Sequence, residues 1–162
     1  INEKNAYNYI GERFSNVTNP IADGSVKERL SFYTTSVQSI IDNPILGIGL
    51  GNWKIKSIDL SKDIIKSYRV PYFVHNDFLQ TAAEIGIIGG LCFVFFILHP
   101  FLISFKNTIQ HFRFDLDFMI FLIFLIYIID SMLNFPIARP ITLIYLFFTI
   151  ILFYKSEKYN LK

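Results

Sequence analysis

The sequence has few cysteines and no cluster of like charges, and both shortages exclude classes of protein. Its 162 residues include one cysteine, so a disulfide within the chain is impossible, and no zinc-ligand spacing is present. The net charge of +2 is small, and lysine and arginine are scattered along the chain. These features argue against nucleic-acid binding, which favours a basic face or tract.

The sequence also lacks an initiator methionine and a signal peptide, because it begins at Ile1. We therefore expect it to be the C-terminal part of a larger protein.

Apolar residues are in excess. They make up 52% of the chain and give a mean hydropathy of +0.42. A membrane span needs about 20 mostly apolar residues, and three segments approach this requirement: 85–105, 116–135 and 140–154. We therefore predict an all-α, polytopic membrane protein, in which a helical extracytoplasmic loop domain at 1–84 precedes a transmembrane region at 85–154.

The basic residues near the predicted spans indicate an orientation. Two lie between the first and second spans and three lie in the tail at 155–162, whereas only Arg139 lies between the second and third spans. Basic loops favour the cytoplasmic side of a membrane. The tail is therefore predicted to be cytoplasmic, and Arg139 is predicted to share the outer side with the loop domain.

The loop domain contains two readable patterns. Ser25-Val26-Lys27-Glu28 has the pattern of a capping box, which predicts a helix over 26–42 that ends before Asn43-Pro44. A loop with alternating glycines follows at 47–51. Its spacing differs from that of a phosphate-binding loop, so a tight turn or a close backbone contact is the better interpretation.

Three further local features are predicted. A short helix is expected near 61–68. Asp77, with Gln80 three residues later, has the pattern of an N-cap for a helix that ends at Gly86. Pro100 is expected to kink the first span.

His75 is the leading candidate for chemistry, because an imidazole with an unperturbed pKa of about 6.5 exchanges protons near neutral pH. It lies beside Asn76 and Asp77, just before the membrane, with Glu84 close in sequence. The alternative is a histidine that only covers a helix start. A helix N-terminus favours the neutral imidazole that a general base needs.

Four charged residues have two interpretations each. Arg29 and Arg69 could bind phosphate in bidentate fashion or simply face solvent. Asp130 lies inside a predicted span, where a carboxylate costs roughly 2.5–3.5 kcal/mol on insertion scales, so it should have a role or a partner. Arg139 is the expected partner, in either a functional or a purely structural ion pair.

These motifs together resemble the O-antigen ligase and O-antigen polymerase family of bacterial membrane glycosyltransferases. The resemblance is carried by Arg29-Leu30, the block from Asp42 to Asn52, His75-Asn76-Asp77-Phe78-Leu79-Gln80, Glu84-Ile85-Gly86-Ile87-Ile88-Gly89, Asp130 and Asn134-Phe135-Pro136.

The resemblance implies an inverting glycosyltransferase of the bacterial cytoplasmic membrane, with its active site on the extracytoplasmic side. Such enzymes transfer a glycan from a polyprenyl diphosphate carrier, such as undecaprenyl diphosphate, to an acceptor hydroxyl in cell-surface polysaccharide or lipopolysaccharide assembly. The acceptor is a glycolipid, a glycan or a protein. No metal, cofactor or nucleotide sugar is expected.

The resemblance also implies roles: His75 would act on the acceptor as general base, Arg29 would hold the diphosphate, and Asp130 would be the acidic residue of the following span. Beyond the resemblance, we expect Arg69 to help Arg29 and Asn76 to support the site. We expect Glu84 to orient His75 or the glycine loop, and Asp130 and Arg139 to shape the outer mouth of the membrane cavity. A further arginine of the family lies upstream of this sequence, so we expect the chain to be inactive by itself.

Two alternatives remain open. Polymerisation of repeat units or glycan transfer to a protein would use the same donor. A non-catalytic module of a transporter or sensor would instead have His75 and Arg29 far apart and facing water.

Overall fold

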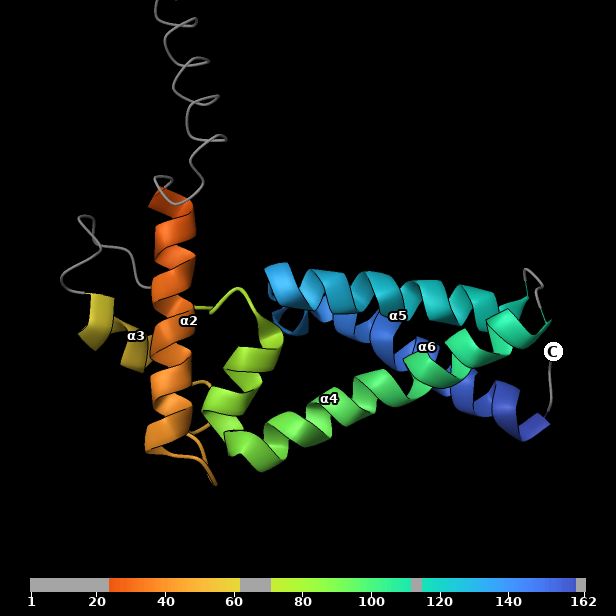
Figure 1. Cartoon of the computed structure of the whole chain (residues 1–162), viewed down its shortest axis with the longest axis horizontal. Helices are drawn as coiled ribbons and strands as arrows, with labels where there is room; N and C mark the ends of the chain where they lie inside the picture. The colour runs from red at the N-terminus through yellow and green to blue at the C-terminus, as the bar shows by residue number, and fades with distance from the viewer. Residues whose placement is uncertain (1–23, 62–70, 112–114, 160–162) are drawn as a thin grey trace, which may run out of the picture.

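The computed structural model describes residues 24–61, 71–111 and 115–159 (Figure 1). All regular elements in these ranges are helices, so the predicted all-α class is confirmed for them. They are α2 (Gly24–Asp42), α3 (Trp53–Ser61), α4 (Asp77–His111), α5 (Leu116–Leu133), the 3-10 helix η2 (Pro136–Ala138) and α6 (Pro140–Tyr159).

The three long helices α4, α5 and α6 form a bundle, and α2 lies across one end of it (Figure 1). The start of α4, the end of α5 and the start of α6 all meet at that end. The bundle core is aliphatic and aromatic, with Ile97 of α4, Ile120 and Phe124 of α5, and Leu146 and Phe153 of α6 buried together. Residues distant in sequence therefore converge beside α2.

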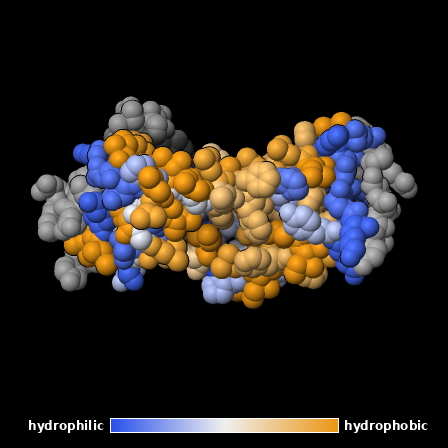
Figure 2. Space-filling model, turned by 90° about the horizontal axis from the view of Figure 1, so that it is seen from below, coloured by the Kyte–Doolittle hydropathy of each residue, from blue (hydrophilic) through white to orange (hydrophobic). Residues whose placement is uncertain are grey.

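The same three helices are long and apolar enough to cross a membrane, over 77–110, 116–133 and 140–158. At most 28% of the most apolar window of each is buried inside the structure, so most of these apolar side chains face outward. Figure 2 shows the result as a hydrophobic belt between two hydrophilic ends. Three spans were predicted, and the described part of the chain contains three helices that could form them.

The helix bounds differ from the bounds of the predicted spans. α4 covers 35 residues but is broken at Gly86, and its part from 87 to 111 alone extends about 38 Å at 1.5 Å per residue, beyond the ~30 Å of a bilayer core. α6 continues to Tyr159, so Lys155 and Lys158 lie in its last turns and not in an extended tail. Apolar composition marks where lipid contact ends, whereas a helix continues until something breaks it.

α4 is interrupted at Gly86, whose φ of 79° and ψ of 175° are not helical. The amide of Ile87 therefore donates to the Pro44 carbonyl at 2.8 Å. The carbonyls of Ala83 and Glu84 accept from Ile48 and Gly49, each at 2.9 Å. The glycine loop thus satisfies the backbone groups that the break leaves free.

Glycine is required at this contact for steric reasons. A Cβ atom at Gly86 would overlap the carbonyl group of Ile45, and one at Gly47 would overlap the carbonyl group of Glu84. The predicted close backbone contact of the loop is therefore present. Pro100 is inside α4 with helical backbone angles, so the interruption falls at Gly86 and not at the proline.

The predicted cap of α4 was assigned to the wrong residue. Asn76 caps the helix, because its Oδ1 accepts from the amide of Leu79 at 3.0 Å. Asp77 is fully buried, and its Oδ2 accepts from the amide of Ile137 at 2.9 Å. Asn and Asp side chains can both cap a helix N-terminus. Asp77 does not cap α4, because its carboxylate binds the amide of Ile137, 60 positions away.

The loop domain also differs in detail from the prediction. α2 begins at Gly24 and ends at Asp42 as predicted, two residues longer at its start. α3 occupies Trp53–Ser61, a helix that the mixed sequence pattern did not reveal. The helix predicted near 61–68 lies outside the described residues, apart from Ser61 at the end of α3.

Replacing Gly86 with alanine should destabilise the protein more than replacing Gly51. Both glycines have positive φ, at 79° and 74°, but a Cβ at Gly51 meets no atom within 4 Å. Gly51→Ala should therefore cost only the backbone conformation, about 1–2 kcal/mol, whereas Gly86→Ala also pushes the loop off α4. Thermal unfolding in detergent measures both variants, and equal losses would contradict the steric role.

Candidate functional site

His75 adopts an unusual backbone conformation immediately before α4. Its φ is 62°, the only positive φ of a non-glycine residue among those described. Two contacts hold it: the Tyr33 hydroxyl donates to the His75 carbonyl at 3.2 Å, and the amide of Val74 donates to the Gln80 side chain at 3.1 Å. Left-handed backbone costs free energy, and such strain gathers at functional sites.

The His75 imidazole is half-buried at the end of the bundle. Its ring meets the ring of Phe135 edge-on, with centroids 5.1 Å apart. Its Nδ1 atom is buried and has no hydrogen-bond partner among the described residues. Burial lowers the pKa of His75 below its ordinary 6.5, and the positive charge of Arg29 lowers it further. The ring is therefore neutral near pH 7 and has an uncommitted nitrogen.

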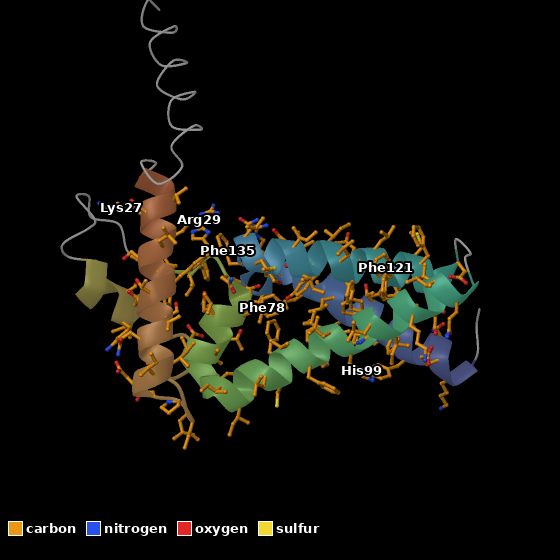
Figure 3. The ribbon with its side chains drawn as sticks, in the orientation of Figure 1. Lys27, Arg29, Phe78, His99, Phe121 and Phe135 are labelled. Carbon is orange, nitrogen blue, oxygen red and sulfur yellow. The ribbon has the colours of Figure 1, made fainter. Side chains whose placement is uncertain are left out.

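Arg29 reaches this site from α2. Figure 3 shows Arg29 pointing from α2 toward the end of α5, on the side of Phe135, whereas Lys27 points away from the bundle. Tyr33 lies four residues after Arg29, one helical turn along the same face. One face of α2 thus supplies both the Arg29 charge near the His75 imidazole and the Tyr33 hydrogen bond to the His75 backbone.

The connection between α5 and α6 closes the site on its other side. Phe73 stacks on Phe135 with ring centroids 4.4 Å apart, and the Arg139 guanidinium lies over the same ring at 4.9 Å. Arg139 is also 4.0 Å from the Asp130 carboxylate, which accepts from the Asn134 side chain at 2.7 Å. Both residues of this pair are partly exposed, so the ion pair is weak, and the guanidinium keeps free donors.

The Glu84 carboxylate binds the glycine loop and the Gln80 side chain. Its Oε2 accepts from the amide of Gly51 at 3.0 Å, and its Oε1 accepts from the amide of Trp53 at 3.3 Å. The side chain of Gln80 also donates to Oε1 at 3.4 Å. Because Gln80 in turn accepts from Val74, Glu84 acts on His75 only through the backbone.

The structure therefore brings most of the predicted residues to one end of the bundle. His75, Arg29, Asp130 and Arg139 gather there, and Asn76 shapes the start of α4. Arg69 lies outside the described residues. The sequence analysis did not identify Tyr33, Phe73 or Phe135 as site residues. The four-residue spacing between Arg29 and Tyr33 could have placed both on one face of a helix. Phe135 belongs to the Asn134-Phe135-Pro136 motif, to which no function was assigned.

A cavity of about 750 Å³ lies next to this site and has Phe73 in its lining. It is lined by the glycine loop, α3, α4 and Ile137, with Phe73 and Tyr72 at one side. Neither His75 nor Arg29 lines it. His75 contacts the Phe135 ring, and Phe135 stacks on Phe73, which lines the cavity, so the imidazole is linked to the cavity through these two rings.

Three long apolar helices and a polar cluster at their common end define a multi-pass membrane protein. Comparison with family models places the chain more narrowly. The O-antigen ligase model matches residues 5–94, more than half of the sequence. The chain belongs to the O-antigen ligase family, and its role is of the O-antigen ligase or polymerase type. Neither the curated proteins nor the solved structures gave a match.

The matched range ends inside α4, so it contains Arg29, His75 and Glu84 but not α5 or α6. Asp130, Phe135 and Arg139 lie outside the matched range, and the fold brings them next to it. The connecting contacts are those of the Phe135 ring with Phe73 and His75, and the hydrogen bond from the Ile137 amide to Asp77.

Removing the Tyr33 hydroxyl should loosen the His75 backbone. Tyr33→Phe keeps the ring but deletes the bond to the His75 carbonyl, which contributes about 0.5–1.5 kcal/mol. Hydrogen exchange of the amides at 74–77 should accelerate. Tyr72→Phe is the matched control, because the Tyr72 side chain is 60% exposed and its hydroxyl forms no hydrogen bond with a described residue. Equal exchange in the two variants would remove Tyr33 from this role.

Proposed function

We propose that this chain contributes the acceptor-activating part of a membrane glycosyltransferase. The enzyme transfers a glycan from a polyprenyl diphosphate carrier to an acceptor hydroxyl at the outer face of the bacterial cytoplasmic membrane. One observation carries the proposal: a half-buried imidazole, held in a left-handed backbone conformation, lies near enough to Arg29 for that charge to lower its pKa, at the end of three apolar helices. A base and a phosphate-binding cation are what this reaction requires.

The chemistry assigns one task to each group. The acceptor hydroxyl gives its proton to His75 as its oxygen attacks the anomeric carbon of the donor. The bond between that carbon and the phosphate oxygen breaks, and the diphosphate leaves with the electron pair. Attack from the side opposite the leaving group inverts the anomeric configuration. Because the diphosphate is already a good leaving group, the protein needs chiefly to position the reactants and stabilise charge.

Arg29 is suited to the departing diphosphate. Its guanidinium forms bidentate hydrogen bonds to phosphate oxygens, and it lies close enough to His75 to lower the pKa of the imidazole. Arg69 remains a proposed helper. Arg139 offers a second cation at the mouth of the bundle, held by Asp130 and Phe135. Asn76 and Glu84 support the site by fixing the start of α4 and the glycine loop.

The orientation of the chain is part of the proposal. α2 and Arg139 lie at one end of the bundle, whereas Lys106, Lys155 and Lys158 lie toward the other end (Figure 1). Basic residues favour the cytoplasmic side, so the end that carries His75 faces outward. A lipid-linked donor in the outer leaflet would present its diphosphate at this level.

The electrostatic effect of Arg29 on His75 argues against a non-catalytic module. A non-catalytic module would have the two residues far apart in water, where solvent and salt would screen such an effect. Transfer to a glycan repeat unit or to a protein uses the same base and the same donor. The acceptor class is therefore left open between these reactions.

Loss of the imidazole should reduce glycan transfer by roughly 10²–10⁴-fold, the usual contribution of a general base. His75→Gln tests this in membranes that contain the intact protein. His99→Gln is a closely matched control. His99 is also half-buried, its Nδ1 is likewise buried without a recorded partner, and its ring meets Phe153 edge-on at 6.1 Å. Similar activities of the two variants would eliminate the base assignment.

The acidic limb of the pH–rate profile should lie below pH 6.5, because the pKa of His75 is lowered and the base is protonated only at lower pH. Arg29→Gln removes a positive charge that disfavours the imidazolium, so the pKa of His75 rises and the limb moves toward neutral pH. The move is partial, since burial is the larger cause of the lowered pKa.

Lys27→Gln is the control for this profile, because Lys27 is on the same helix but points away from the bundle (Figure 3). It should leave the acidic limb in place. If Arg29→Gln lowers the rate at all pH values but leaves the acidic limb in place, Arg29 acts only on the diphosphate and does not lower the pKa of His75.

A further inference from the structure

The 750 Å³ cavity has the size of a ligand site, since pockets for small molecules occupy about 300–1,000 Å³. One of its walls comes from α4 on both sides of the Gly86 break, and after the break the contributing residues, at 89, 92, 93 and 96, recur at the spacing of one helix face. Ile85, Phe93 and Phe96 supply apolar side chains, whereas Gly89 and Cys92 are small and leave space between them. The cavity is therefore an apolar groove along this helix.

The location of this groove limits what can occupy it. The α4 wall belongs to a helix long and apolar enough to span a membrane. Phe96 is 40% exposed, and Leu50 at the loop edge is 81% exposed. Within a bilayer these surfaces face hydrocarbon and not water. A flexible hydrocarbon chain is the occupant that such a groove accepts without leaving polar groups unpaired.

The lining of the groove also includes two charged residues, Lys54 and Glu84. Lys54 of α3 lines it, is exposed, and forms no ion pair with the carboxylates of the described residues. Glu84 lines it too, but both of its oxygens accept from the loop amides and Gln80. The charge left to recognise a ligand is therefore positive, and its natural partner is an anionic head group.

We propose that this groove is a binding site for an anionic phospholipid of the bilayer, with an acyl chain along α4 between Ile85 and Phe96 and the phosphate at Lys54. The assignment goes beyond the transferase function and does not depend on it. A lysine near the membrane surface attracts anionic lipid, and an apolar channel directly beside it holds the chain.

The groove is distinct from the diphosphate site proposed above. Phe73 stacks on the Phe135 ring, and the Arg139 guanidinium lies over that ring. Both groups are in close contact with the ring, so they must occupy opposite faces of it. Phe73 lines the groove, whereas Arg29 points from α2 toward the side of Phe135 (Figure 3). Neither Arg29 nor Arg139 lines the groove, so a diphosphate held by them lies outside it.

The test is photo-crosslinking of the intact membrane protein in phosphatidylcholine vesicles that contain phosphatidylglycerol with a diazirine in its acyl chain. Crosslinks should concentrate at 85–96 of α4. Unlabelled phosphatidylglycerol should compete, whereas additional phosphatidylcholine should not. Lys54→Gln should weaken the competition by about fivefold, since one lysine near a surface contributes on the order of 1 kcal/mol.

Two matched controls separate the groove from general lipid contact. Lys56→Gln removes a neighbouring α3 lysine that does not line the groove, and it should leave competition unchanged. Cys92→Phe should fill the groove and abolish the crosslinks. Leu102→Phe, at a position on α4 that is 55% exposed and outside the groove, should leave them intact.

Three outcomes would overturn the proposal. Crosslinks spread evenly along the exposed face of α4 would show ordinary lipid contact. Equal competition by phosphatidylcholine would exclude recognition of the head group. Stronger competition by polyprenyl phosphate than by phosphatidylglycerol would assign the groove to the donor. None of these measurements involves glycan transfer, so they succeed or fail independently of the proposed catalytic role.

Discussion

The exchange of backbone hydrogen bonds at Gly86 is the constraint on which the site depends. A helix interrupted near a membrane leaves amides and carbonyls that cost several kcal/mol each if nothing satisfies them. The loop from Pro44 to Gly51 supplies the missing partners, with Ile87 donating to Pro44 and the carbonyls of Ala83 and Glu84 accepting from the loop. The loop is thereby fixed to α4 by hydrogen bonds between backbone groups.

This attachment extends to the candidate base. Glu84 accepts from Gly51 and Trp53, Gln80 donates to Glu84, and the same Gln80 accepts from the amide of Val74. The chain of bonds ends one residue before His75. α2 completes the restraint from the other side through Tyr33. The left-handed conformation of His75 is thus held by contacts from the loop, α4 and α2 together.

Sequence patterns predicted the parts of this structure that local chemistry determines. The three apolar runs became helices, Asn43-Pro44 ended α2, and alternating glycines marked a close backbone contact. The same patterns could not identify the partners. Asn76 and Asp77 are both good caps, and the choice between them depends on Ile137. Tyr33 meets His75 across 42 positions, and Phe135 joins His75, Phe73 and Arg139 through a turn that has no helical or strand periodicity.

The dependence of the site on Phe135 has a consequence for biogenesis. Ribosomes deliver α2, His75 and α4 before the second and third spans. Until the α5–α6 turn docks, His75 has no aromatic neighbour at 5.1 Å, and the buried Asp77 carboxylate has no amide from Ile137. The end of the bundle that carries His75 is therefore completed last, when all three spans have been inserted.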